Sequence, residues 1–237
     1  MSWSVSRAFF VCGLKGAGKT SLIQGLIQRG NAKGEQPAGF KPFETDQLGR
    51  NAREEDADGE IFVSLMQKEP NENLINPYKA NEDYPVEMAF RRDGIQIKWD
   101  YVASRKQILC QHYDPVYIET PAGLFTPLTE DKDLLAWMVE WDLPILYVLS
   151  QKKEHFPLQL AEIELLKAKG LNYHLWLNNP VMPKDGDYLF YLWEKSEIHA
   201  GQLIEGMLPF IPEPTPESIA IQIEEHLPGL LKKIDEA

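Results

Sequence analysis

One short glycine-rich segment constrains the fold of this chain more than any other feature. It matches the pattern G-x-x-x-x-G-K-[ST], and its residues are Gly13, Leu14, Lys15, Gly16, Ala17, Gly18, Lys19 and Thr20. A continuous apolar run at residues 8–12 precedes it, as in a strand covered on both faces. Apolar residues at helical spacing follow over residues 20–29, and Gly30 provides a stop signal. The segment therefore joins a strand to a helix, which is the context that a phosphate-binding loop requires.

The residue types of this loop explain how it would bind a nucleotide. Glycines let backbone N–H groups turn inward around phosphate oxygens, and the positive end of the helix dipole adds to their field. We expect Lys19 to neutralise the outer phosphates and Thr20 to offer its hydroxyl to Mg²⁺. The nucleotide-binding residues predicted from the loop are Gly13, Lys15, Gly16, Ala17, Gly18, Lys19, Thr20 and Ser21. The alternative is a glycine-rich helix-entry turn that binds no ligand.

Predicted strands and helices alternate along the rest of the chain. Apolar runs predict further strands at residues 39–41, 116–119, 145–149 and 174–178. Helical periodicity predicts helices at residues 61–67, 101–112, 134–141, 158–169, 188–195 and 216–234. Residues 47–60 are acidic and poor in apolar side chains, so they predict a loop. The alternation predicts an α/β fold of the P-loop NTPase type, with a mostly parallel sheet and helices on both faces.

Composition limits the classes of partner and compartment. The 237 residues show no break in composition, so we expect a single domain over residues 1–237. The net charge of -12 argues against nucleic acid as a partner, because binding to phosphate backbones relies on clustered Lys and Arg. The chain has no apolar run of the ~20 residues that a membrane span needs, and its first residues lack a secretory signal. A cytoplasmic protein that does not bind membranes is therefore expected.

Metal chemistry is predicted to rest on carboxylates. The five histidines lack zinc-site spacing, and Cys12 and Cys110 form no metal-ligand cluster. Glu119 ends the apolar run at residues 116–119, which places it at the same sheet edge as the glycine-rich loop and within reach of Mg²⁺. Asp56 and Asp58 precede a predicted helix and are the candidates for another ligand. The residues alone leave the choice between these two open.

Several short segments occur in the order typical of one known family. They are Gly18-Lys19-Thr20, Phe40-Lys41-Pro42-Phe43, Asn76-Pro77-Tyr78, the run from Glu119 to Leu128, residues 143–148, Trp176-Leu177-Asn178 and residues 208–212. In this order and with these gaps, the chain resembles the dethiobiotin synthetase family from the P-loop to about Pro212. Beyond the P-loop, the ordered combination carries the resemblance rather than any single segment.

The resemblance implies an ATP-dependent ring closure. In this family a vicinal diamine captures CO2 as a carbamate, the carbamate attacks the terminal phosphate of ATP, and the second amine closes a cyclic urea. On this reading Lys19 and Lys41 are the catalytic residues, with Lys41 stabilising the carbamate and the mixed anhydride. Counting back from Asn76-Pro77-Tyr78 selects Asp58 over Asp56, provided that no insertion intervenes. Three residues would then hold Mg²⁺, namely Thr20, Asp58 and Glu119.

The resemblance also implies an acceptor site and a partner. Thr45 stands where the family has a small hydroxyl residue near the substrate, and Asn178 resembles the asparagine that binds the adenine edge. The predicted substrate-binding residues are Lys41, Thr45, Pro121, Ala122 and Gly123. The family forms homodimers with the substrate at the interface, so a homodimer is expected here.

Departures from the family pattern gather on the acceptor side. Lys15 and Gly16 replace a threonine and an acidic residue, and Tyr84-Pro85-Val86 stands where Ser-Pro-His is frequent. Pro121 interrupts a glycine-rich loop and removes one backbone donor. This pattern fits a diverged synthetase, or a paralogue that kept ATP chemistry and changed its acceptor.

Two further hypotheses compete with the ligase. A partition-type, nucleotide-switched dimeric ATPase would carry a lysine five residues before the P-loop lysine, but that position holds Leu14. Such proteins also attach to membranes through a basic amphipathic helix, whereas residues 216–234 are acidic on balance. The third hypothesis is a relative that keeps the fold and has lost catalysis.

Overall fold

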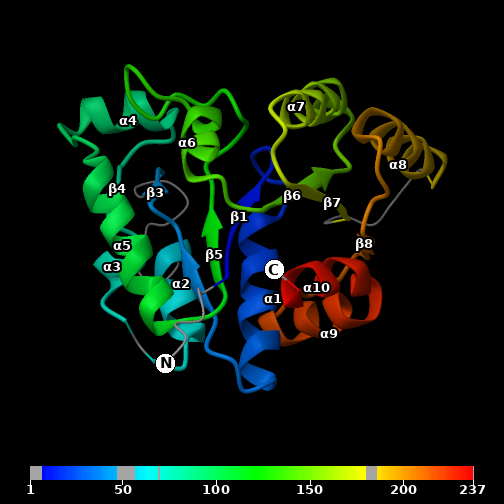
Figure 1. The fold of residues 1–237 in the computed structure, drawn as a ribbon, viewed down its shortest axis with the longest axis horizontal. Coiled ribbons are helices and arrows are strands. Elements are labelled where there is room, and N and C mark those ends of the chain that lie inside the picture. Colours follow the sequence, from blue (N-terminus) through cyan, green and yellow to red (C-terminus); the bar gives the residue numbers. More distant parts are fainter. Residues whose placement is uncertain (1–6, 47–56, 69, 180–185, 237) are drawn as a thin grey trace.

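The computed structural model describes residues 7–46, 57–68, 70–179 and 186–236. Six strands form one sheet in the order β2-β5-β1-β6-β7-β8, and each neighbouring pair is parallel (Figure 1). They are β1 (Ala8–Cys12), β2 (Ala38–Phe40), β5 (Val116–Glu119), β6 (Ile145–Ser150), β7 (Tyr173–Asn178) and β8 (Met207–Leu208). A separate parallel pair consists of β3 (Phe43–Glu44) and β4 (Tyr78–Lys79). The predicted α/β fold with a mostly parallel sheet is confirmed.

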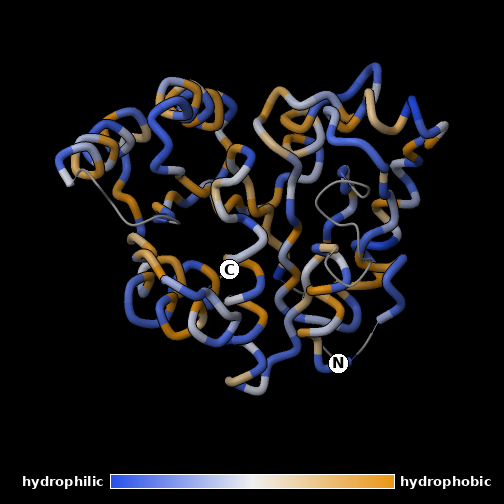
Figure 2. Tube along the Cα trace, turned by 180° about the vertical axis from the view of Figure 1, so that it is seen from behind, coloured by the Kyte–Doolittle hydropathy of each residue, from blue (hydrophilic) through white to orange (hydrophobic). Residues whose placement is uncertain are grey.

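Helices connect and cover the strands. They are α1 (Lys19–Ala32), α2 (Asp58–Leu65), α3 (Glu72–Ile75), α4 (Val86–Arg92), α5 (Trp99–His112), α6 (Leu134–Trp141), α7 (Phe156–Ala168), α8 (Gly186–Ala200), α9 (Pro216–His226) and α10 (Pro228–Asp235), with the short 3₁₀ helix η2 (Lys153–His155) before α7. Most helices alternate between hydrophilic and hydrophobic segments (Figure 2), as expected of helices that cover a core on one side. In the described residues, α1 packs against α9, and α7 packs against α8.

The order of the strands determines where a ligand can bind. From β1 the chain runs through α1 to β2 on one side, whereas β6, β7 and β8 are added in turn on the other side. Crossovers between parallel strands are right-handed. Helices that connect strands on one side of β1 therefore cover one face of the sheet, and helices that connect strands on its other side cover the opposite face. Ligands of such sheets bind beyond the carboxyl ends of the strands, where the direction reverses. Here that point is the end of β1.

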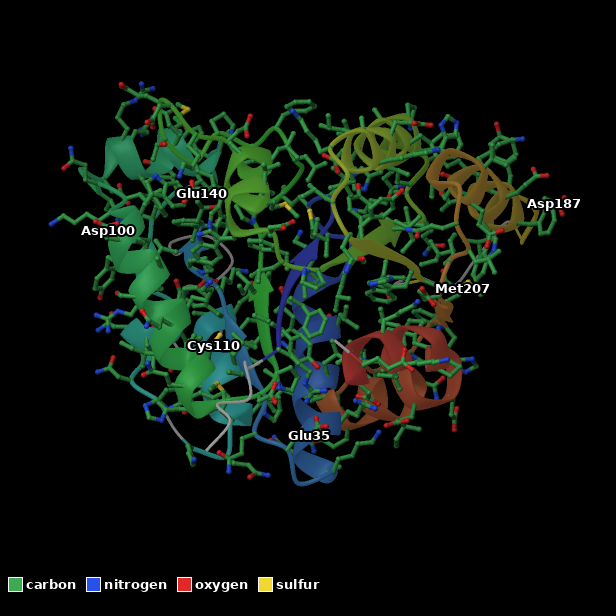
Figure 3. The ribbon with its side chains drawn as sticks, viewed as in Figure 1. Glu35, Asp100, Cys110, Glu140, Asp187 and Met207 are labelled. Atoms are coloured by element: carbon green, nitrogen blue, oxygen red, sulfur yellow. The ribbon has the colours of Figure 1, made fainter. Side chains whose placement is uncertain are left out.

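The carboxyl ends of the central strands lie at one end of the molecule. The arrows of β1 and β5 point to the upper part of Figure 1, so their carboxyl ends lie there. Glu35, which follows α1, lies at the opposite, lower end, and Met207 marks β8 at one side of the molecule (Figure 3). The candidate site is therefore expected in the upper part of these views.

The central strands are buried along their whole length. Every residue of β1 and β6 is buried, as the continuous apolar runs predict for strands that are covered on both faces. The ring of Phe10 in β1 lies 5.0 Å from that of Trp137 in α6, which in turn lies 4.9 Å from the ring of Trp141. These aromatic contacts fix α6 against the sheet.

Two predictions about local structure are wrong. The helix predicted over residues 216–234 is two helices, because Pro228 lacks the backbone N–H that a continuous helix would need and instead starts α10. The loop predicted over residues 47–60 extends too far, because Asp58 already begins α2. Residues 47–56 of that loop lie outside the described residues. The sequence patterns also missed six short elements, namely α3, α4, η2, β3, β4 and β8.

None of the helices in the described ranges combines the length and the apolar character that a membrane crossing demands.

Candidate active site

The glycine-rich loop lies between β1 and α1 and needs glycine at two tightly packed positions. Gly13 has φ +145° and Gly18 has φ +98°. A Cβ atom at Gly13 would lie 2.6 Å from the carbonyl oxygen of Val148, and one at Gly18 would overlap the side-chain amide of Asn178. Because larger residues rarely adopt these φ values and would also clash, both positions require glycine.

Lys19, the first residue of α1, folds back over the loop. Its Nζ donates to the carbonyl oxygens of Gly13 at 2.9 Å and Leu14 at 3.2 Å, and the residue is 7% exposed. Burial lowers the pKa of Lys19, and the nearby carboxylate of Glu119 opposes this effect. The structure thus holds a buried ammonium group against the loop.

Three oxygen-bearing side chains meet beside this loop. The hydroxyl of Thr20 donates to Glu119 Oε1 at 2.9 Å and, at 3.4 Å, to Asp58 Oδ2. Glu119 reaches this place because β5 pairs with β1 in the register that sets it opposite Val11. Asp58 comes from the first turn of α2. Residues from three parts of the sequence therefore converge at the carboxyl end of β1, the sheet edge at which Glu119 was expected.

Lys41 completes this cluster. It lies between β2 and β3, and its Nζ donates to Glu119 Oε1 at 2.9 Å and to Asp58 Oδ2. Burial acts to lower the pKa of Lys41, but the carboxylates of Glu119, Asp58 and Glu44 outweigh this and raise it. Lys41 is therefore a buried cation at neutral pH, and it shares its carboxylates with the hydroxyl of Thr20.

These donors fit a magnesium ion. Hydroxyl and carboxylate oxygens are hard ligands, and Mg²⁺ is usually bound through one or two carboxylates together with substrate phosphates and water. Glu119 Oε2 is buried and has no hydrogen-bond partner among the described residues, so it remains available as a ligand. The described ranges contain no cluster of three or more His, Cys, Asp or Glu with metal-binding geometry. A cation held by Asp58 and Glu119 would thus rely on phosphate and water for the rest of its coordination. Asp56 lies outside the described residues.

A cavity of about 860 Å³ opens over the cluster. It is lined by thirteen of the predicted site residues, namely Lys15, Gly16, Gly18, Lys19, Thr20, Ser21, Lys41, Thr45, Asp58, Glu119, Pro121, Ala122 and Gly123. Among the lining residues, Lys15 Nζ forms an ion pair with Asp83 Oδ1 at 2.5 Å, and the two side chains are 63% and 51% exposed. Phe125, which is 64% exposed, also lines the cavity. The cavity therefore joins the phosphate-binding loop to a largely apolar wall.

Three predicted residues do not line this cavity, namely Gly13, Ala17 and Asn178. The side-chain amide of Asn178 donates to the carbonyl oxygen of Ala17 at 2.7 Å and so holds the glycine-rich loop from the end of β7. Its contact with an adenine edge stays a prediction.

Sequence reasoning missed two buried carboxylates in the cavity wall. Glu44 accepts hydrogen bonds from the backbone N–H of Asp58 and from the side chain of Asn76. Glu162 accepts from the backbone N–H of Leu124 at 2.7 Å and from the hydroxyl of Tyr147 at 2.5 Å. Burial raises the pKa of both carboxyl groups. No local sequence signal marks either residue, because their partners lie elsewhere in the chain.

The fold has a known structural counterpart. The MinD cell division protein of Aquifex aeolicus superposes with a TM-score of 0.55 and 15% sequence identity, and the match covers 93% of this chain and 96% of the MinD chain. At this identity the likeness shows the shared P-loop fold alone.

Comparisons of sequence identify the family. The family model described as "AAA domain" matches residues 7–213. The ATP-dependent dethiobiotin synthetase BioD of Vibrio parahaemolyticus is 27% identical, over 86% of this chain and 90% of the relative. BioD of Vibrio vulnificus is 29% identical over 87% and 91%, and BioD 1 of Escherichia coli K12 is 25% identical over 91% and 96%. The chain therefore belongs to the AAA-domain family and is a P-loop protein similar to the dethiobiotin synthetases.

Proposed function

We propose that this protein is an ATP- and Mg²⁺-dependent ligase of the dethiobiotin synthetase type. It would join CO2 to 7,8-diaminopelargonic acid and close a cyclic urea, a step of biotin biosynthesis. The dethiobiotin synthetases compared above match along most of their length and most of this chain. The convergence of Thr20, Lys41, Asp58 and Glu119 beside the phosphate-binding loop is the observation that carries the proposal.

The nucleotide end of the cavity suits a triphosphate. Backbone N–H groups of the loop and the N-terminus of α1 provide the anion-binding field, and the buried ammonium of Lys19 adds a positive charge. Lys19 would move from its loop carbonyls to the transferring phosphoryl group. Thr20, Asp58 and Glu119 would hold Mg²⁺, which neutralises phosphate charge when it is bound. The side-chain amide of Asn178 would meet the adenine edge from the end of β7.

The proposed reaction balances without a redox partner. One amine of the diamine adds to CO2 and loses a proton, which gives a carbamate. A carbamate oxygen attacks the terminal phosphorus of ATP, and ADP leaves. The second amine then attacks the carbamoyl carbon and expels phosphate, which closes the ring. The products are the cyclic urea, ADP and inorganic phosphate.

Lys41 is suited to the first two steps. Its ammonium group is buried, held charged by Glu119 and Asp58, and exposed to the cavity between the loop and the acceptor wall. A fixed cation at this place would stabilise the carbamate and the mixed anhydride as negative charge develops on oxygen.

The acceptor would lie against the opposite wall. Thr45 and the segment from Pro121 to Gly123 line that side together with Phe125, so an alkyl chain would find apolar contacts there. The synthetase resemblance adds one expectation to this proposal, namely a homodimer. The cytoplasmic location expected from the sequence stays a prediction.

Diamine-dependent release of ADP tests the proposal. The assay contains Mg²⁺, ATP and bicarbonate, with 7,8-diaminopelargonic acid present or absent, and couples ADP to a spectroscopic readout. The ligase predicts ADP release that requires both the diamine and bicarbonate. ADP release at the same rate with and without the diamine would contradict the proposal and would favour a nucleotide switch.

A paralogue with a changed acceptor remains the second candidate. The observation that favours it is the Lys15–Asp83 ion pair, which places a cation and an anion at the acceptor side of the cavity. Activity with another vicinal diamine, but not with 7,8-diaminopelargonic acid, would select this candidate.

A further inference from the structure

Glu44 is a buried carboxylate that touches the proposed metal site without being one of its ligands. It is 2% exposed and ends the two-residue strand β3. Its Oε1 accepts the backbone N–H of Asp58 at 3.1 Å, and its Oε2 accepts the side-chain amide of Asn76. Both carboxylate oxygens therefore have assigned partners.

The contact with Asp58 lies at the start of α2. The first N–H groups of a helix have no partner within the helix, so an outside acceptor fixes where the helix begins. Asp58 is the first residue of α2, and its N-cap residue Ala57 provides no side-chain hydrogen bond. Glu44 thus supplies, from a distant segment, a hydrogen bond that local capping does not.

Asn76 holds Glu44 in turn. It is fully buried directly after α3, and its side chain packs so closely on Gly59 that a Cβ atom there would lie 2.7 Å from Asn76 Cβ. The first turn of α2 is therefore held on both sides, by the carboxylate of Glu44 and by the packing of Asn76.

We propose that Glu44 is a positioning residue for the metal site, and this inference rests on the proposed function. By fixing the first turn of α2, Glu44 sets the carboxylate of Asp58 within reach of both Thr20 and Lys41. It does not touch the reacting atoms. Residues that orient metal ligands in this way typically affect metal affinity by about 10- to 100-fold.

Substitution by glutamine separates the hydrogen bonds from the charge. A glutamine at position 44 can still accept from Asp58 N–H through its carbonyl oxygen. Its amide group would face Asn76, whose buried Oδ1 has no hydrogen-bond partner among the described residues. A flip of the Asn76 amide would turn that oxygen toward the new donor and complete the network. Glu44→Gln should therefore preserve the position of Asp58, whereas Glu44→Ala should not.

Magnesium affinity is the readout, measured without turnover. A fluorescent ATP analogue is bound to the full chain, and Mg²⁺ is titrated for the wild type, Glu44→Ala and Glu44→Gln. Glu60→Ala is the matched control, because it removes another acid from the first turn of α2 that does not line the cavity. We expect Mg²⁺ affinity to fall about 10-fold or more in Glu44→Ala. It should stay within about threefold of wild type in Glu44→Gln and Glu60→Ala, and metal-free nucleotide binding should not change.

The outcomes separate this inference from the proposed function. Equal Mg²⁺ affinity in Glu44→Ala and the wild type would overturn the positioning role while leaving the ligase proposal intact. A loss in Glu44→Gln as large as in Glu44→Ala would overturn it as well, because charge rather than placement would then dominate. If the wild type binds nucleotide without any Mg²⁺ dependence, the proposed function fails and this inference with it. If Glu44→Ala does not fold, Glu44→Met replaces it at similar volume, with the same expected loss.

Discussion

The two sides of the cavity, which the proposed function assigns to the nucleotide and to the acceptor, differ in how they are built. On the nucleotide side, functional groups are held by the carboxyl ends of the buried strands β1 and β5 and by the first turn of α1. On the acceptor side, the wall comes from the loops around Thr45, Asp83 and Pro121 and from the exposed ring of Phe125. The nucleotide side keeps the P-loop pattern, whereas the departures from the synthetase pattern lie mostly on the acceptor side.

This contrast follows from what each side has to do. Binding phosphate requires backbone N–H groups and glycines in fixed conformations, so the fold itself determines the site. An acceptor is held by a few side chains on loops, and loops tolerate change because few other contacts depend on them. A chain can therefore alter its acceptor while it preserves its nucleotide chemistry.

The largest expected contrast concerns the two cysteines. Burial, with a contribution from Glu162, raises the pKa of Cys12 from its ordinary value of 9.0 to about 12. At pH 8 this lowers its reactive thiolate fraction about a thousandfold. Cys110, on α5, is only partly buried. We expect iodoacetamide to label Cys110 and spare Cys12, as measured by mass spectrometry. Equal labelling rates for the two cysteines would show that β1, which ends at Cys12, opens readily to the reagent.

Substitution of Lys41 tests whether this residue acts in turnover rather than in nucleotide binding. Lys41→Ala should lower kcat ~100-fold or more, because a preorganised charge at the reacting group is lost. Binding of Mg²⁺ and ATP should stay within a few-fold, measured with the fluorescent analogue. Lys79→Ala, which removes another ion-paired lysine outside the cavity, should leave kcat unchanged. An equal loss of binding and turnover in Lys41→Ala would contradict the assigned role.

Gly18 tests how closely the nucleotide side is packed. Gly18→Ala would force a Cβ atom into the amide of Asn178 and displace the loop, so nucleotide affinity should fall about 10-fold or more. Gly34→Ala is the control. Gly34 has φ +78° with no atom within 4 Å of an added Cβ, so it carries similar backbone strain, of about 1–2 kcal/mol, without the clash. Similar nucleotide affinity in both variants would show that the contact with Asn178 does not shape the loop.

The smallest effect is expected on the acceptor side. Asp83→Ala breaks an exposed ion pair with Lys15, so the free energy of unfolding should change by less than about 1 kcal/mol. The KM of the acceptor should change about threefold with kcat unaltered, since the pair lines the cavity whereas Lys41 is paired with Asp58 and Glu119. Glu82→Ala breaks the neighbouring exposed pair with Arg92 outside the cavity and should leave both constants unchanged. A drop in kcat for Asp83→Ala would place the ion pair among the reacting groups.

Much of the nucleotide side could be predicted because its signals are local. The loop pattern lies between an apolar run and a helical pattern, and Glu119 ends another apolar run, so parallel pairing alone brings them together. The convergence of Asp58 and Lys41 depended on the synthetase resemblance, because neither residue carries a distinctive local pattern. The metal, nucleotide and acceptor roles of all these residues stay predictions, as does the single domain.

The remainder could not be read from the sequence for physical reasons. The strands β3 and β4 have two residues each, which is too short for any periodicity. Glu44 becomes part of the site through Asn76, 32 residues further along the chain, so its burial has no sequence signal. The break between α9 and α10 was accessible, since Pro228 marks it, but the apolar spacing on either side favoured one continuous helix.

Identification of the reaction product tests the central claim most directly. The protein is incubated with Mg²⁺, ATP, ¹³C-bicarbonate and 7,8-diaminopelargonic acid, and the products are analysed by mass spectrometry. The proposed ligase predicts a cyclic urea that carries one ¹³C atom and forms in step with ADP. Release of ADP without a ¹³C-labelled urea would contradict the claim that the nucleotide side serves ring closure on this acceptor.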